Sequence, residues 1–186
     1  MDMFDDALPA QWVSGDGQLQ FALTVPAEAE LFYPQWRDAA VARQLGMAPV
    51  QDLTAVRSLI GYYSGMAQTG EAARYTVRLN GTVVGICGYN GIDRDDSRTE
   101  IGYEILPAKQ GRGLGTAVIA ALVAQAWGPL HLNRVSAGVL PDNAPSLAAL
   151  AANGFLTEGT LRQFTRIGDQ AYDLVICSKV HALDAQ

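Results

Sequence analysis

Three glycines within five residues, in the segment Gln110-Gly111-Arg112-Gly113-Leu114-Gly115, give the strongest chemical signal in the chain. The segment follows a strand-like stretch that ends at Ile105, and it opens an apolar, alanine-rich stretch. Backbone N–H groups at a helix N-terminus bind anions, because they lack partners and lie at the positive end of the helix dipole. Glycines let a bulky diphosphate approach that backbone, and Lys109 and Arg112 add positive charge. The segment therefore predicts a pyrophosphate-binding loop.

Three other uses of a glycine cluster fit less well. A plain strand-to-helix turn explains one or two of the glycines, but not all three. A Walker A loop ends in Gly-Lys-Ser/Thr, whereas Gly115 is followed by Thr116 and Ala117. A dinucleotide fingerprint needs Gly-x-Gly-x-x-Gly after an early strand, and Thr116 breaks that spacing. Both nucleotide folds are therefore disfavoured.

The elements that position this loop follow from hydrophobic periodicity. Alternation predicts strands over 18–25, 74–79, 82–91, 99–105, 134–140, 155–166 and 172–178. Helical spacing predicts two short helices within 26–46, separated by a break at Pro34, and further helices over 52–68, 112–127 and 144–153. A long helix between two strands implies a right-handed crossover, so 99–105 and 134–140 should pair in parallel. We expect an α/β (α+β) fold in a single domain over 1–186, with a mixed central sheet of about seven strands flanked by helices.

The net charge and the length of the longest apolar run limit the classes of partner that we expect. The chain has 186 residues and a net charge of −6, which disfavours nucleic acid and suits a cationic small molecule or a basic peptide. The acidic opening MDMFDDALPA is unlike a secretory signal, and the longest apolar run, Ala117–Trp127, is too short to span a bilayer. We therefore expect a cytoplasmic protein with no membrane partner. No metal is expected, because metal-ligand spacing is absent around the lone cysteines and histidines, Cys87, Cys177, His131 and His181.

The glycine segment QGRGLG resembles the Gln/Arg-x-x-Gly-x-Gly/Ala signature of the GNAT superfamily of acyl-CoA-dependent N-acetyltransferases, and the element order is similar to that fold. The stretches TEIGYEI, LNRVSAGVLPDNAPSLAALAANGFLTEGTLRQF and GDQAYDLVICS resemble the RimJ/RimL branch. The first 70 residues match only in their elements. The resemblance implies a splayed parallel pair, with the pantetheine arm of acetyl-CoA in the gap, and backbone hydrogen bonds to that arm from Ile105. It assigns coenzyme A binding to Ile105, Gln110, Gly111, Arg112, Gly113, Leu114, Gly115, Thr116, Asn143 and Ser146.

The resemblance also implies two proton-transfer groups. Ser146, in Asn143-x-x-Ser146, would protonate the leaving thiolate, although Asn143 as an N-cap and Ser146 in the first turn are also ordinary helix chemistry. We assign the base to Glu100, which lies with Glu104 on one face of 99–105 unless a bulge interrupts the alternation. A structural carboxylate at Glu100 and a base acting through water are the alternatives. Some relatives carry a glutamate shortly after the Glu-Gly pair, but this chain has Gln163.

These residues predict an acetyl-CoA-dependent N-acetyltransferase that acts directly on a primary amine. The acceptor would be a protein N-terminus, an amino acid or polyamine, or an aminated small molecule, and a homodimer is possible by analogy. Acceptor selection would fall to Phe32, Tyr33, Trp36 and the acidic loop 93–96, whose alternative roles are core packing and a solvated loop. Glu158 and Asp173 are expected to stabilise the C-terminal strands. A non-catalytic acyl-CoA-binding module is the alternative function.

Overall fold

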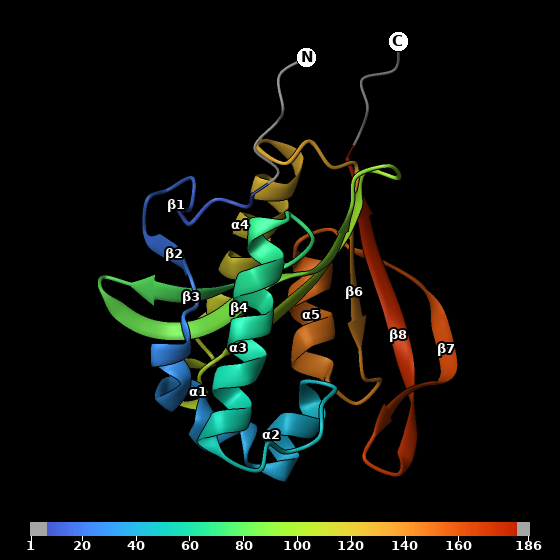
Figure 1. Cartoon of the computed structure of the whole chain (residues 1–186). Coiled ribbons are helices and arrows are strands. Elements are labelled where there is room, and N and C mark those ends of the chain that lie inside the picture. Colours follow the sequence, from blue (N-terminus) through green and yellow to red (C-terminus); the bar gives the residue numbers. More distant parts are fainter. Residues whose placement is uncertain (1–6, 182–186) are drawn as a thin grey trace.

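The computed structural model describes residues 7–181, which build one eight-stranded sheet (Figure 1). In spatial order the strands are β1–β2–β3–β4–β5–β6–β8–β7, and only β5 and β6 pair in parallel. Their bounds are Gln11–Val13, Leu19–Leu23, Ala73–Leu79, Thr82–Asp93, Arg98–Ile105, Arg134–Val139, Leu156–Ile167 for β7 and Gln170–Val180 for β8. The predicted mixed sheet is confirmed. The additional strand is β1, whose three residues are too few to show alternation.

Helices cover both faces of this sheet (Figure 1). On one face lie α1 (Ala29–Trp36), α2 (Ala39–Gln44) and α3 (Leu53–Gln68), preceded by a 3-10 turn at Pro26–Glu28. On the other face lie α4 (Leu114–Trp127) and α5 (Ala144–Ala152). A second 3-10 turn, Pro107–Lys109, connects β5 to α4. None of the helices in this described part of the chain is long and apolar enough to cross a membrane.

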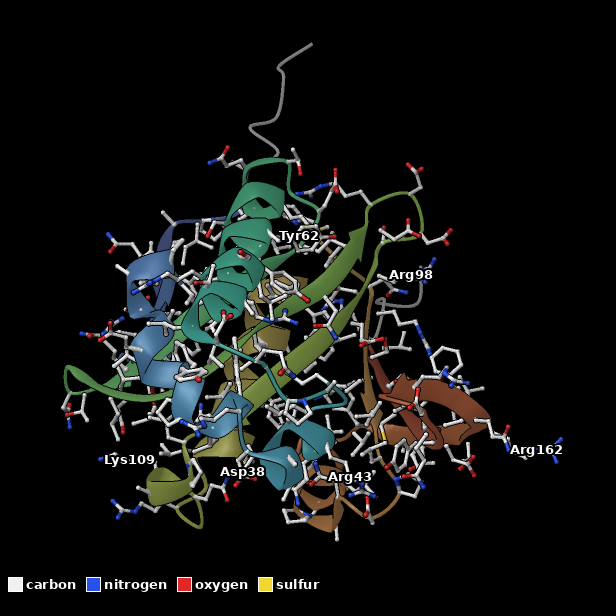
Figure 2. The ribbon with its side chains drawn as sticks, turned by 60° about the horizontal axis from the view of Figure 1, so that its bottom comes forward. Asp38, Arg43, Tyr62, Arg98, Lys109 and Arg162 are labelled. Carbon is white, nitrogen blue, oxygen red and sulfur yellow. The ribbon has the colours of Figure 1, made fainter. Side chains whose placement is uncertain are left out.

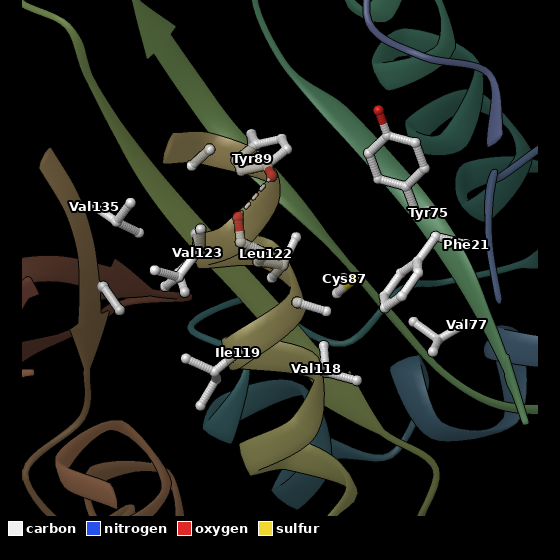
Figure 3. Close-up of a cluster of buried hydrophobic side chains, with 14 of the residues drawn as sticks. Phe21, Tyr75, Val77, Cys87, Tyr89, Val118, Ile119, Leu122, Val123 and Val135 are labelled. Carbon is white, nitrogen blue, oxygen red and sulfur yellow. Dashed lines mark hydrogen bonds between the residues drawn. The ribbon is translucent and has the colours of Figure 1, made fainter. Parts of the chain in front are cut away.

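The main core lies between α4 and the sheet (Figure 3). Val118, Ile119 and Leu122 of α4 are fully buried against β4 and its neighbours. The Tyr89 hydroxyl of β4 donates to the Leu122 carbonyl at 3.0 Å, which satisfies a buried polar group. Cys87 is a free thiol in this core, and burial raises its pKa, so it acts as a small apolar side chain. The helix that follows the glycine turn is thus firmly anchored.

A smaller core joins α1 and α3 to the sheet. Val56 and Ile60 of α3 pack with Phe32 and Trp36 of α1, and the Asp52 side chain caps α3 by accepting from Ala55 N–H at 2.9 Å. The break predicted at Pro34 is wrong, because α1 continues through it to Trp36. Pro34 removes one intrahelical hydrogen bond, but burial of the apolar face of α1 keeps the turn helical. The interruption comes two residues later, before Asp38 caps α2.

The parallel pair parts after three residues. Arg98 pairs with Arg134, Thr99 with Val135, and Glu100 with Ser136, and the ladder ends there. Strand β5 stays paired with β4 as far as Ile105, and β6 stays paired with β8 as far as Val139. The predicted parallel pairing therefore holds at one end only. Beyond Glu100 and Ser136, the facing backbone edges of β5 and β6 have no strand between them.

Candidate active site

The glycine turn lies at the end of β5, where the two strands have parted. Gly111 and Gly113 have φ values of +73° and +74°, in the left-handed region that favours glycine. Gly113 is the N-cap of α4, and no side chain caps that first turn. A β-carbon built on either glycine would meet no atom within 4 Å. The glycines therefore provide backbone conformation and an open approach to the uncapped N–H groups of α4, as the sequence predicted.

The Gln110 side chain holds this turn against the strand. Its Nε2 donates to the Ile105 carbonyl at 2.9 Å. Leu106 N–H donates to the Val84 carbonyl of β4 at 2.9 Å, so the hydrogen-bonding groups of residues 104 and 106 face β4. By the alternation of an antiparallel ladder, those of Tyr103 and Ile105 face the gap. Because Gln110 occupies the Ile105 carbonyl, the Ile105 N–H is left as a donor toward the gap.

The positive charges beside the turn are accessible. Arg112 is exposed. Lys109 is half-buried and lies on the 3-10 turn that precedes α4 (Figure 2). Leu114 and Gly115 form the first turn of α4, and the Ile105 side chain lies 3.9 Å from a β-carbon built on Gly115. The Thr116 carbonyl accepts from Nδ2 of Asn153, the C-cap residue of α5, at 3.1 Å, which ties α4 to α5. Coenzyme A binding by these residues stays a prediction.

Ser146 makes contacts that fit each of the two roles expected from the sequence, and its role as an acid stays a prediction. Asn143 is the N-cap of α5, and its side chain accepts from Ser146 N–H at 3.3 Å, which is ordinary helix capping. The Ser146 hydroxyl, however, lies 2.7 Å from the Tyr103 hydroxyl of β5. Burial raises the pKa of Tyr103 to about 12, so its phenol stays protonated and can donate to Ser146 Oγ. The sequence analysis assigned no role to Tyr103.

Glu100 lies where β5 and β6 are still paired. It is exposed, and it accepts from Asn90 Nδ2 at 2.6 Å. Asn90 falls at a bulge between Tyr89 and Gly91, and its other side-chain atom accepts from Arg74. The Arg74 guanidinium in turn stacks over the Tyr63 ring, 4.1 Å from its centroid. Glu100 therefore belongs to a surface hydrogen-bond network, which resembles the structural role that was its alternative. Its role as a base stays a prediction.

Glu104 differs sharply from Glu100. It is 9% exposed, and Oε2 accepts from Trp36 Nε1 at 2.8 Å. Its other oxygen, Oε1, is buried without a hydrogen-bond partner. Burial raises the pKa of Glu104 from 4.5 to about 7, and the side chains of Trp36 and Gln35 oppose that rise. The alternation placed Glu104 on the same face as Glu100, but burial under α1 could not be predicted from strand periodicity.

The residues expected to select an acceptor divide between core and surface. Phe32 and Trp36 are buried in the smaller core, whereas Tyr33 is only half-buried and Arg37 lies over its ring. In the loop 93–96, Asp93 and Asp96 pair with Arg98. Core packing, the alternative role, thus accounts for Phe32 and Trp36 but not for Tyr33.

The two C-terminal carboxylates stabilise β7 and β8, as expected. Glu158 pairs with Arg134 of β6 and accepts from the Ser178 hydroxyl of β8 at 2.5 Å, and these contacts lower its pKa to about 2. Asp173 accepts from the backbone N–H of Gln163, which has a positive φ at a register shift of the hairpin. Among residues 7–181, no group of three or more His, Cys, Asp or Glu residues could hold a metal ion.

Comparison with known proteins agrees with this geometry. Residues 19–156 match the family model described as acetyltransferase (GNAT) domain. The uncharacterized N-acetyltransferase p20 of Bacillus licheniformis is 29% identical over 153 residues, which are 81% of this chain and 86% of that protein. Among solved structures, RimL, a ribosomal alpha-N-protein acetyltransferase in complex with coenzyme A, superposes with a TM-score of 0.80 at 19% identity, covering 88% of this chain and 94% of RimL. The microcin self-immunity acetyltransferase MccE, in complex with acetyl-CoA and AMP, superposes at 0.77 with 24% identity, covering 88% and 93%.

The splayed pair and the structural neighbours define the class of fold, that of the acyl-CoA-dependent acetyltransferases. The family model matches well over half of the sequence. The chain therefore belongs to the GNAT family of N-acetyltransferases.

Proposed function

We propose that this chain uses acetyl-CoA to acetylate a primary amine, and that the α-amine of a protein or peptide is its favoured acceptor class. The observation that carries the proposal is the gap between β5 and β6. Their ladder ends at Glu100 and Ser136, and the glycine turn lies at the end of β5 that is free of β6. An extended ligand arm that is anchored at the turn can thus lie along an unpaired strand edge.

The residues around the gap fit coenzyme A. The open backbone from Gly111 to Thr116 would take the pyrophosphate, with Arg112 beside it. The backbone of Tyr103 and Ile105 would hold the pantetheine arm as a neighbouring strand would. When bound, acetyl-CoA supplies the activated thioester. One N–H aimed at the thioester oxygen is worth about 3 kcal/mol in acyl transfer, and the N–H groups of Tyr103 and Ile105 are the candidates.

Protons move at two atoms in this reaction, the acceptor nitrogen and the departing sulfur. An acceptor R–NH₃⁺ must lose one proton before its nitrogen attacks the thioester carbon. After the attack the nitrogen loses a second proton, and the sulfur gains one as the C–S bond breaks. The products are the acetylated amine, free coenzyme A and one proton released to solvent. Ser146 would protonate the sulfur, with Tyr103 donating to Ser146 Oγ so that the serine proton points away from Tyr103. The sequence analysis assigned the base to Glu100.

The favoured acceptor rests on net charge and on relatives. A chain with a net charge of −6 attracts cationic amines and basic peptide N-termini. RimL is described as a ribosomal alpha-N-protein acetyltransferase, and an Escherichia coli relative, 29% identical over 57% of this chain, as a ribosomal-protein-serine acetyltransferase. A single domain over 1–186, cytoplasmic location and a homodimer stay predictions.

A coenzyme A release assay with a panel of amines tests the proposal. The panel contains a peptide with a free N-terminus, a polyamine, free amino acids and an amino sugar. We expect thiol release that depends on the amine, fastest with the peptide. Tight acetyl-CoA binding without turnover on any member would instead support the acyl-CoA-binding module.

A further inference from the structure

We propose that Glu104 is the general base that takes the proton from the acceptor amine, directly or through one water molecule, and that Trp36 positions its carboxylate. The inference rests on the proposed function and names a different base from Glu100, the residue that the sequence predicted. Three observations carry it: the place of Glu104 on β5, the hydrogen bond from Trp36, and the unpaired oxygen Oε1.

The position of Glu104 places it across the sheet from Ser146. The side chain of Tyr103 reaches Ser146 on the face covered by α4 and α5, whereas that of Glu104 meets Trp36 of α1 on the opposite face. A thioester in the gap beside Tyr103 would therefore have an acid on one face and a carboxylate on the other. Glu104 is one residue from Tyr103, about 3.3 Å along the strand, whereas Glu100 is three residues away, roughly 10 Å. The position along β5 relative to Tyr103 thus favours Glu104 over Glu100.

One oxygen of the Glu104 carboxylate has no hydrogen-bond donor. Trp36 Nε1 donates to Oε2, whereas Oε1 is buried without a partner, which costs stability when the carboxyl is ionised. The Gln35 side chain lies near enough to favour the charged form, but its Nε2 makes no hydrogen bond of good geometry. Among the buried polar atoms without a partner in the described residues, Oε1 of Glu104 is the one that belongs to a carboxyl group. An acceptor ammonium group or its water would supply the missing donor.

The groups that face Glu104 suit a base that works near neutral pH. Gln35 and Trp36 of α1 and Ile86 of β4 surround the carboxyl, and all are uncharged. Burial raises its pKa to about 7 against the opposing effects of the Trp36 and Gln35 side chains, and no charge on a described residue contributes. General bases act best when their pKa is near the working pH. Removing the Trp36 donor should raise that pKa further, because the bond favours the charged form.

The test is Glu104→Gln in the full chain, which keeps an acceptor for Trp36. We expect acetyl-CoA affinity by calorimetry to change less than twofold, while kcat falls by on the order of 100-fold. Trp36→Phe should keep measurable activity but shift the rise of kcat with pH to higher pH. Glu30→Gln is the matched control on exposed α1 surface, with unchanged kcat expected.

Two outcomes would overturn the role of Glu104 alone, in an active wild-type enzyme. One is a Glu104→Gln variant with kcat within threefold of wild type. The other is a large loss in Glu100→Gln but not in Glu104→Gln. A wild-type chain that binds acetyl-CoA and transfers to no amine would instead overturn the proposed function, so the two failures are distinguishable.

Discussion

The hydroxyl groups of Tyr103 and Ser146 lie 2.7 Å apart and join β5 to the first turn of α5. The two residues are 43 positions apart in sequence, and they meet because α5 packs on the same face of the sheet as the Tyr103 side chain. A serine whose only role was to donate its backbone N–H to the Asn143 cap would need no such partner. The contact therefore makes Ser146 a stronger candidate acid than its sequence context alone.

Removing the Ser146 hydroxyl should slow the chemical step. We expect Ser146→Ala to lower kcat by about 10- to 100-fold, with little change in KM for acetyl-CoA, because the hydroxyl acts on the departing sulfur and not on the bound ground state. Steady-state kinetics with a peptide acceptor measures both constants. An unchanged kcat would show that the Ser146 hydroxyl has only a structural role in the first turn of α5.

Tyr103→Phe tests the partner hydroxyl separately. The ring would stay in place while the bond to Ser146 is lost, so kcat should fall by less than in Ser146→Ala. In the double variant the Tyr103 substitution should add nothing further, because the two hydroxyls act as one unit. Fully additive losses, measured in a double-mutant cycle, would contradict that coupling.

Gly113→Val should block coenzyme A without unfolding the protein. The side chain would occupy the open space above the turn, and the positive φ adds about 1–2 kcal/mol of strain. We expect acetyl-CoA affinity, measured by calorimetry, to weaken by at least about 100-fold. Gly17→Val is a matched control, since Gly17 has φ +72° and open space in the turn between β1 and β2. Equal affinities in both variants would remove the pyrophosphate assignment.

Glu104 should make stability depend on pH. Its pKa is raised from 4.5 to about 7 on folding, so the folded chain holds this proton more tightly than the unfolded chain. The resulting stability is fully present below pH 4.5 and is lost as pH rises through 7, a loss on the order of 3 kcal/mol. Glu104→Gln lacks this loss, so urea unfolding should show the variant gaining stability relative to wild type between pH 5 and pH 8. A constant difference at both values would show that the carboxyl is not buried as described.

The sequence predicted those features of the fold and of the site that depend on local patterns of residues. Gly111 and Gly113 predicted the turn, and the order of strand, helix and strand predicted the parallel pair. Both predictions depend only on residues that lie close together in the sequence. The contacts of Glu104 could not be predicted this way, since its partner Trp36 is 68 positions away and reaches it only through the packing of α1. The helix break predicted at Pro34 was wrong for the same reason. Tertiary burial of Trp36 outweighed the preference of a proline to end a helix.

The most direct test of the central claim is product analysis by mass spectrometry. The wild-type chain would be incubated with acetyl-CoA and a basic peptide that lacks lysine, either with a free N-terminus or with the same N-terminus blocked. We predict one acetyl group on the α-nitrogen of the free peptide, matched by release of free coenzyme A, and none on the blocked peptide. No acetylation of the free peptide or of any other primary amine, despite bound acetyl-CoA, would contradict the account.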